Sequence, residues 1–208
     1  MIPIETIAMF IVASAALSLS PGPDNIFVLT QSAMKGRKAG IFVTLGLCTG
    51  LMFHTAMVSL GIAAIFQTSE LAFNTLKIIG ALYLLYLAWQ AFRSSAANFE
   101  TVNDDLLDWK ALYLRGIIMN ITNPKVAIFF LAFLPQFADP SVGSITLQMI
   151  LFGCLFIITT LVIFSSVAWS AGFLGEWLKS SEKSQSIINK MAGTVFVGLA
   201  IKLAVTSR

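Results

Sequence analysis

Charged residues are scarce in this chain of 208 residues: only 11% are Asp, Glu, Lys or Arg, whereas 57% are hydrophobic. A single water-soluble core cannot cover that much apolar surface, so lipid must cover part of the chain. The net charge of +3 does not indicate nucleic-acid binding, because the basic residues fall in short loops between apolar runs. We therefore expect an all-α integral membrane protein surrounded by the lipid bilayer.

Cysteine and histidine are also rare. Cys48 and Cys154 lie in separate apolar segments without paired spacing, so neither a secreted disulfide framework nor a zinc site is indicated. His54 is the only histidine and falls inside an apolar segment. Such a histidine usually bonds a neighbouring helix, and a proton relay is the functional alternative. We expect no metal, no cofactor and no catalytic residue.

The apolar residues form six segments, each close to the length that crosses a bilayer. The first is interpreted as an uncleaved membrane helix rather than a signal peptide, because Glu5 is the only charge before Asp24 and no basic region precedes it. The expected segments are 4 to 33, 39 to 67, 71 to 92, 112 to 137, 144 to 174 and 188 to 205.

One polar linker, at about residues 94–111, divides the six segments into two halves, about 1–93 and 112–208. Because each half has an odd number of segments, the second half must enter the membrane in the opposite orientation to the first. We expect a single transmembrane domain, 1–208, built as a 3+3 inverted repeat.

Lysine and arginine gather on one side of this arrangement. The opposite loops offer Glu70 and Asp139. Because cytoplasmic loops carry an excess of Lys and Arg, the basic side is expected in the cytoplasm and both termini outside. The residues on the basic side are Lys35, Arg37, Lys38, Arg93, Lys110, Arg115, Lys179, Lys183 and Lys190.

A polar interruption stands inside the first segment, at Ser20-Pro21-Gly22-Pro23-Asp24-Asn25. Pro21 and Pro23 remove two backbone donors and clash with the preceding turn, and Gly22 permits unusual dihedral angles. Asp24 and Asn25 offer acceptors to whatever occupies the gap. We expect the helix to break here.

A second interruption, Asn123-Pro124-Lys125, stands inside the fourth segment, the leading segment of the second half. Asn123 is a favoured N-cap and Pro124 a favoured first helical residue, so a new half-helix is expected to begin there. At about 1.5 Å per residue, Asp24 and Lys125 both lie about 15 Å from the basic side, the middle of a core about 30 Å thick.

Two charges at the membrane midplane, each at a break in a helix, indicate a binding site for ions or zwitterions. Asp24 is expected to bind a substrate ammonium group or a proton. Lys125 and the half-helix that begins at Asn123 are expected to bind a carboxylate. The alternative is that the breaks are kinks and that Asp24 and Lys125 form a structural ion pair.

The chain resembles the LysE/RhtB family of bacterial amino-acid exporters over its full length. The resemblance rests on Leu19 to Asp24, on Asn120-Ile121-Thr122-Asn123-Pro124-Lys125 and on Phe133-Leu134-Pro135-Gln136-Phe137. It implies a small multi-pass exporter of the bacterial inner membrane, driven by the proton gradient and without a cofactor. Gly46 to Gly50 followed by His54 is similar to homoserine/threonine-type members, and this glycine pair also favours close helix packing.

Two other function classes stay open. A membrane thiol-redox relay would use Cys48 and Cys154, although both lie away from the breaks. A divalent-metal exporter would need several ligands at the midplane, where the sequence offers Asp24 and His54. The sequence leaves open which amino acid is exported, which ion drives the export, and whether the protein is a homodimer.

Overall fold

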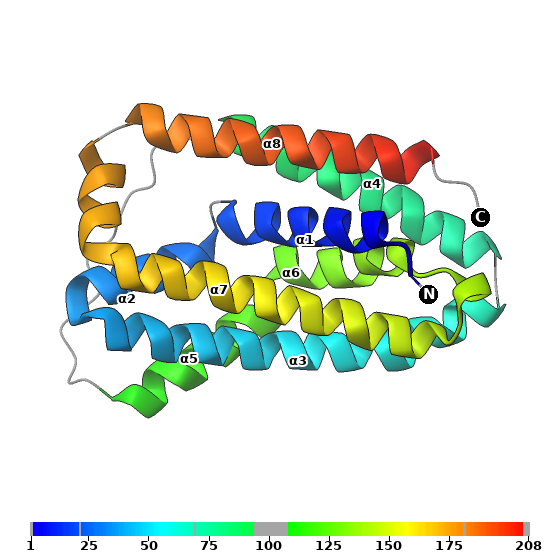
Figure 1. The fold of residues 1–208 in the computed structure, drawn as a ribbon, viewed down its shortest axis with the longest axis horizontal. Coiled ribbons are helices and arrows are strands. Elements are labelled where there is room, and N and C mark those ends of the chain that lie inside the picture. The colour runs from blue at the N-terminus through cyan, green and yellow to red at the C-terminus, as the bar shows by residue number, and fades with distance from the viewer. Residues whose placement is uncertain (1, 21, 69, 94–107, 181, 206–208) are drawn as a thin grey trace.

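Two broken and four unbroken helical units lie lengthwise in the structure, a computed structural model that describes all residues except 1, 21, 69, 94–107, 181 and 206–208 (Figure 1). The described residues contain no strand. The unbroken helices are α3 (Arg37–Thr68), α4 (Glu70–Arg93), α7 (Ile145–Ser180) and α8 (Glu182–Val205).

The two bent units are the predicted broken helices. The first consists of α1 (Ile4–Leu19) and α2 (Pro23–Lys35), which meet at 60°. The second consists of α5 (Trp109–Thr122) and α6 (Pro124–Ile128), and the bend at this junction is 51°. Both predicted break positions are therefore confirmed, except that Pro21 lies outside the described residues.

The chain continues from α6 without a loop into a π-helix, η1 (Phe129–Phe133), and a 3-10 helix, η2 (Leu134–Phe137). A further 3-10 turn, η3 (Pro140–Val142), precedes α7. Pro135 at the start of η2 prevents a longer α-helix, because it lacks the amide that the next turn would need.

Membrane-crossing length is met by four units of the described chain. Arg37–Gly61 and Ile145–Ala171 are long and apolar enough as they stand, and each bent unit meets the test when taken as one span. Helices α4 and α8 add shorter apolar stretches, Ile78–Arg93 and Asn189–Ile201. The number of spans is thus two to four by length and composition, and the six-span repeat stays a prediction.

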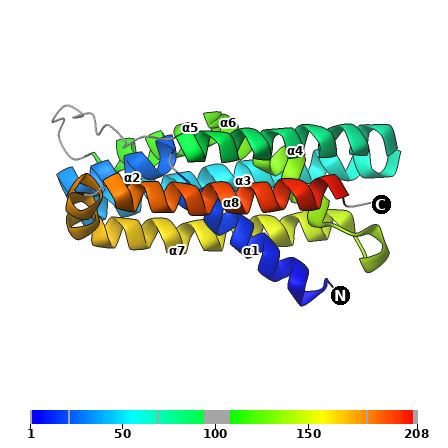
Figure 2. The ribbon, with the colours of Figure 1, turned by 90° about the horizontal axis from the view of Figure 1, so that it is seen from above.

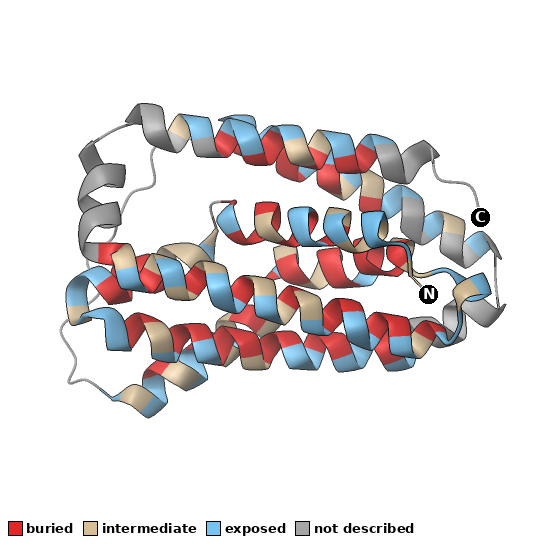
Figure 3. Cartoon of the chain, in the orientation of Figure 1, coloured by how far each residue is buried: buried red, intermediate tan, exposed pale blue. Residues whose placement is uncertain are grey.

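The outer surface is apolar, as a lipid-facing surface requires. Figure 3 shows exposed and partly exposed residues on the outward sides of the helices, with buried residues toward the centre. The exposed side chains include Leu60, Leu147 and Trp169, each about two-thirds exposed or more (77%, 68% and 67%). Large apolar side chains exposed in such number indicate a surface that faces lipid or another protein.

Phenylalanine rings fill the core where α1, η1, η2 and α7 meet. The ring centroids of Phe10 and Phe152 are 4.8 Å apart, and those of Phe129 and Phe133 are 4.7 Å apart. The first contact joins α1 to α7, and the second lies within the π-helix. Phe10 also contacts Phe129, which ties the π-helix to α1. Figure 2 shows that α1 crosses the other helices obliquely at this point.

The helix ends that carry most of the basic residues lie together. Figure 1 shows the end of α2, the start of α3 and the start of α5 at one end of the molecule, and both chain termini at the other. Residues 94–107 of the linker lie outside the described residues, and its last residues begin α5, where the carboxylate of Asp108 accepts a hydrogen bond from Lys110 N at 2.9 Å and caps the helix.

This arrangement predicts that the linker is cytoplasmic and that the η3 turn is external. In a variant without Cys48 and Cys154, a membrane-impermeant maleimide added to intact cells should label Ser141→Cys and should not label Asn98→Cys until the cells are opened. Labelling of Asn98→Cys in intact cells would show that the orientation is reversed.

Candidate functional site

The two helix breaks face each other at the centre of the molecule (Figure 1). Ser20 ends α1 with extended dihedral angles (φ −60°, ψ 131°), and Pro23 opens α2. Asn123 is also extended (φ −74°, ψ 109°), because the ring of Pro124 disfavours the helical conformation in the preceding residue. Each break leaves backbone carbonyls without their usual helical partners, so side chains have to supply hydrogen bonds.

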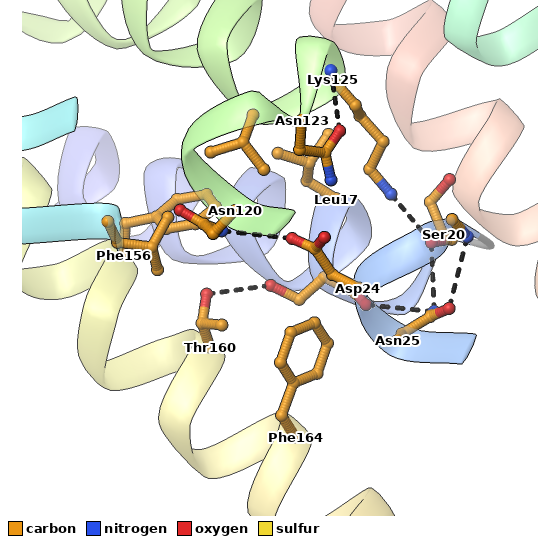
Figure 4. A pocket seen from close by; sticks show the side chains of 14 residues that line it. Leu17, Ser20, Asp24, Asn25, Asn120, Asn123, Lys125, Phe156, Thr160 and Phe164 are labelled. Atoms are coloured by element: carbon orange, nitrogen blue, oxygen red, sulfur yellow. Dashed lines mark hydrogen bonds between the residues drawn. The ribbon is translucent and has the colours of Figure 1, made fainter. Parts of the chain in front are cut away.

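Asp24 is buried at the first turn of α2, with 7% of its surface exposed. Its Oδ2 accepts a hydrogen bond from Asn120 Nδ2 at 3.1 Å, across to the second broken helix. Its Oδ1 is buried and has no hydrogen-bond partner among the described residues. Figure 4 shows this carboxylate facing the side chains of Asn120 and Asn123.

Lys125 reaches in the opposite direction, from α6 to the first break. Its Nζ donates a hydrogen bond to the carbonyl oxygen of Ser20 at 2.9 Å (Figure 4). No ion pair joins Lys125 to Asp24 in the described part of the chain, where each charged group instead bonds a neutral polar group of the other broken helix. The direct structural ion pair considered from the sequence is therefore not present.

Asn25 lines the same cavity, and its side-chain amide is hydrogen-bonded to backbone groups of the first break. Asn25 Nδ2 lies within hydrogen-bond distance of the carbonyls of Ser18, Leu19 and Ser20, at 3.4, 3.2 and 3.1 Å. Its Oδ1 accepts from Gly22 N at 3.3 Å. Asn25 thus replaces the missing helical donors at the end of α1.

Gly22 has a different role from the one its sequence position suggests. Its backbone is extended (φ −180°, ψ 172°), a conformation open to any residue, so the expectation of unusual dihedral angles is wrong. A Cβ atom at this position would lie 3.2 Å from Lys125 Nζ. The absence of a side chain therefore gives Lys125 room to reach the Ser20 carbonyl.

Asn123 caps the half-helix as predicted, since its Oδ1 accepts a hydrogen bond from Lys125 N at 3.0 Å. This bond uses one of the amides that were expected to face a ligand, and Pro124 has none. The positive group that this break offers the cavity is consequently the Lys125 side chain.

Asn120 connects the site to the rest of the molecule, and the sequence analysis did not include it among the site residues. It is 2% exposed, and its Nδ2 donates a hydrogen bond to Asp24 Oδ2. Its carbonyl oxygen accepts from His54 Nε2 at 3.2 Å. The expected helix-to-helix bond of His54 is therefore present, and this carbonyl requires the ring proton on Nε2. The sequence signal that could have identified Asn120 was its position one turn before Asn123.

Close packing of α3 against α5 holds Asn120 in place. A Cβ atom at Gly50 would lie 2.7 Å from the Cβ atom of Asn120, and one at Gly46 would overlap the carbonyl oxygen of Tyr113. The packing role expected for this glycine pair is confirmed, and Gly50 in particular leaves space for the residue that bonds Asp24.

The groups at the two breaks line a small, partly open cavity of about 20 Å³, room for about one water molecule. Its wall comes from both broken helices and from α3 and α7. The lining residues are Leu17, Ser18, Ser20, Gly22, Asp24, Asn25, Leu51, Asn120, Asn123, Lys125, Val126, Phe156, Thr160 and Phe164.

Neither cysteine lines this cavity. Cys48 is buried on α3 and Cys154 is exposed on α7, and both are free thiols. Within the described residues there is also no group of three or more His, Cys, Asp or Glu side chains that could hold a metal ion. The features that a thiol relay or a metal exporter would need are not assembled at this site.

Comparisons with known proteins agree with the resemblance. Residues 15–207 match the family model of the LysE type translocators. The chain is 32% identical to a homoserine/homoserine lactone efflux protein of Salmonella typhimurium, with 94% of each chain covered. It is 29% identical to the uncharacterized membrane protein YrhP of Bacillus subtilis, over 95% of this chain and 98% of that one. No solved structure matches.

The glycine at position 50 provides a test of how the site is held. Gly50→Ala should destabilise the protein by about 1 to 3 kcal/mol, because the new methyl group overlaps Asn120. The matched control is Gly61→Ala in the same helix, where a Cβ atom meets nothing within 4 Å and stability should be unchanged or slightly higher. Thermal unfolding in detergent measures both, and equal melting temperatures would contradict the packing described here.

Proposed function

Because the chain belongs to the family of LysE type translocators, we propose that it is a secondary active transporter that exports amino acids or close derivatives across the bacterial inner membrane by proton antiport. One observation carries the proposal. Among the residues that line the cavity, one carboxylate, which is buried, and one ammonium group, on a partly buried lysine, lie at the meeting point of two broken helices without direct contact. Both are available to a zwitterion.

Each charged group has a distinct role in this proposal. Asp24 binds the substrate ammonium group or a proton, because its Oδ1 is a buried acceptor without a described partner. Lys125 binds the substrate carboxylate through Nζ, which uses only one of its three donors on Ser20. Asn120 holds the Asp24 side chain directly, whereas Asn25 and Asn123 hold the backbone of the two breaks from which Asp24 and Lys125 project.

The bent units are the leading helices of two inverted repeats, each with three spans. Helix contacts support this assignment, because they pair equivalent elements. The second helices α3 and α7 pack on each other, and so do the third helices α4 and α8. The contact of α3 with α5 has its counterpart in that of α7 with α1. An exchange of the two halves preserves all of these pairs.

Transport requires the cavity to enlarge, since the space seen here holds about one water molecule and an amino acid is several times larger. Rocking of the two repeats about the breaks opens one side at a time. The packed phenylalanine rings close the path toward the end that carries the chain termini.

His54 is a candidate for proton transfer at the edge of this site. It is joined to Asp24 through Asn120, by the backbone carbonyl at one end and the side-chain amide at the other. An amide side chain does not relay protons as a water molecule does. In this structure, the role of His54 is therefore to orient Asn120. A relay would begin only where water reaches both the ring and the carboxylate.

The relatives named homoserine/homoserine lactone efflux protein make these compounds the first substrates to examine. Efflux of a panel of labelled amino acids from loaded vesicles, with and without a pH gradient, tests the proposed function. Gradient-dependent efflux of at least one amino acid is the expected result.

Replacement of the midplane charges tests the site. Asp24→Asn should lower gradient-driven efflux to background while the protein still inserts, because the ionisable group is lost and the shape is kept. Lys125→Met should raise the KM for substrate about tenfold or more, since it removes a charge-assisted hydrogen bond to the carboxylate. The matched controls are Glu5→Gln and Lys38→Met, which neutralise exposed charges outside the cavity.

The double variant separates a binding role from a structural one. An Asp24→Asn, Lys125→Met protein should be inactive even where its abundance and melting temperature equal those of the parent. Normal efflux by that protein would show that the pair is scaffolding and that the substrate binds elsewhere.

The cysteines provide a test against the thiol relay. Joint replacement of Cys48 and Cys154 by alanine should leave the efflux rate within about twofold of the parent, because neither lines the cavity. Loss of efflux at unchanged membrane abundance would support redox chemistry instead.

A further inference from the structure

The hydroxyl groups of Ser18 and Thr160 depart from a pattern that holds in most of the helices. Serine and threonine hydroxyls within this chain usually donate to the carbonyl oxygen four residues earlier, as Ser14 does to Phe10 at 2.7 Å and Thr159 to Leu155 at 2.8 Å. This local bond satisfies a hydroxyl in an apolar surrounding without any other partner. Ser18 and Thr160 do not make it.

Ser18 and Thr160 instead bond each other across the interface of α1 and α7. Their oxygens are 3.2 Å apart, and both side chains are buried, with 7% and 3% of their surfaces exposed. Two hydroxyls carry two hydrogens, and this single bond uses one of them. No other hydrogen bond is found for either hydroxyl in the part of the chain that the structure describes, so a donor and several acceptor positions stay open.

Both hydroxyls line the cavity that contains Asp24 and Lys125. Figure 4 shows Thr160 on the opposite side of Asp24 from Lys125, between Phe156 and Phe164 of the same helix. The other lining residues of α1 and α7 are Leu17, Phe156 and Phe164, so the hydroxyl pair is the polar feature of this wall.

We infer that Ser18 and Thr160 form the side-chain subsite of the transporter and that they select amino acids whose short side chain carries a hydrogen-bonding group. This inference rests on the proposed function. An amino acid whose carboxylate lies at Lys125 and whose ammonium lies at Asp24 directs its side chain toward the α1–α7 wall. A hydroxyl or carbonyl there completes the bonding of the pair, whereas a methyl group leaves a buried donor without a partner.

Selectivity between compounds of equal size is the measured quantity. Homoserine is compared with norvaline and threonine with valine, because each pair differs by a hydroxyl in place of a methyl group. The parent should export the hydroxylated member with the higher kcat/KM. Thr160→Val and Ser18→Ala should lower this preference roughly three- to tenfold, the effect of one hydrogen bond, chiefly through faster export of the apolar member relative to the other.

The matched controls lie beside the subsite. Thr159→Val and Ser14→Ala remove hydroxyls that bond only their own helix, and both should keep the parent ratio. Thr160→Ser keeps the hydroxyl and should also keep the ratio, which separates hydrogen bonding from a packing defect if Thr160→Val is poorly folded.

The outcomes distinguish the subsite from the transporter. An unchanged ratio in Thr160→Val and Ser18→Ala, with export that still depends on Asp24, overturns the subsite and leaves the proposed function standing. Absence of Asp24-dependent export of every amino acid in the panel overturns the proposed function and the subsite with it.

Discussion

The structure depends on satisfying backbone carbonyls where two helices break inside an apolar surrounding. A carbonyl that loses its helical donor in lipid or in a dry core costs several kcal/mol unless another donor replaces it. Asn25 meets this requirement at the end of α1 by bonding three successive carbonyl oxygens, and Lys125 adds a bond to the last of them. The bond from Lys125 comes from the other broken helix, so the two breaks stabilise each other.

The consequence for the site is that the charged groups are held apart. Asp24 is bonded by Asn120 and Lys125 is bonded to Ser20, and each of these contacts crosses between the broken helices. An ion pair would have used both charges on each other and left little for a ligand. Neutral partners preserve the charge of both groups while satisfying part of their hydrogen-bonding capacity, which is the condition a zwitterion site has to meet.

The sequence predicted where the two helices break but not which side chains meet there. Pro23, Asn123 and Pro124 act through local backbone chemistry, so their effect could be inferred from neighbouring residues alone. The bond from Asn120 to Asp24 depends on how α5 is rotated about its axis, and the approach of Lys125 to Ser20 depends on how the two bent helices cross. Both follow from packing between distant segments, such as the contact of Gly50 with Asn120, which a pattern along one segment does not contain.

The separate placement of one negative and one positive side chain in a single cavity also has an electrical consequence. With Asp24 and Lys125 both ionised, the site sums to zero charge, and it still sums to zero after a zwitterion enters. The membrane potential therefore does no work on the empty site or on the zwitterion-loaded site when access changes from one side of the membrane to the other. In the proposed proton antiport, a proton on Asp24 would leave the positive charge of Lys125 uncompensated, and movement of that charge across the whole potential toward the negative interior would be favourable by about 2.3 kcal/mol per 100 mV. Under this proposal, voltage acts on the protonated form alone.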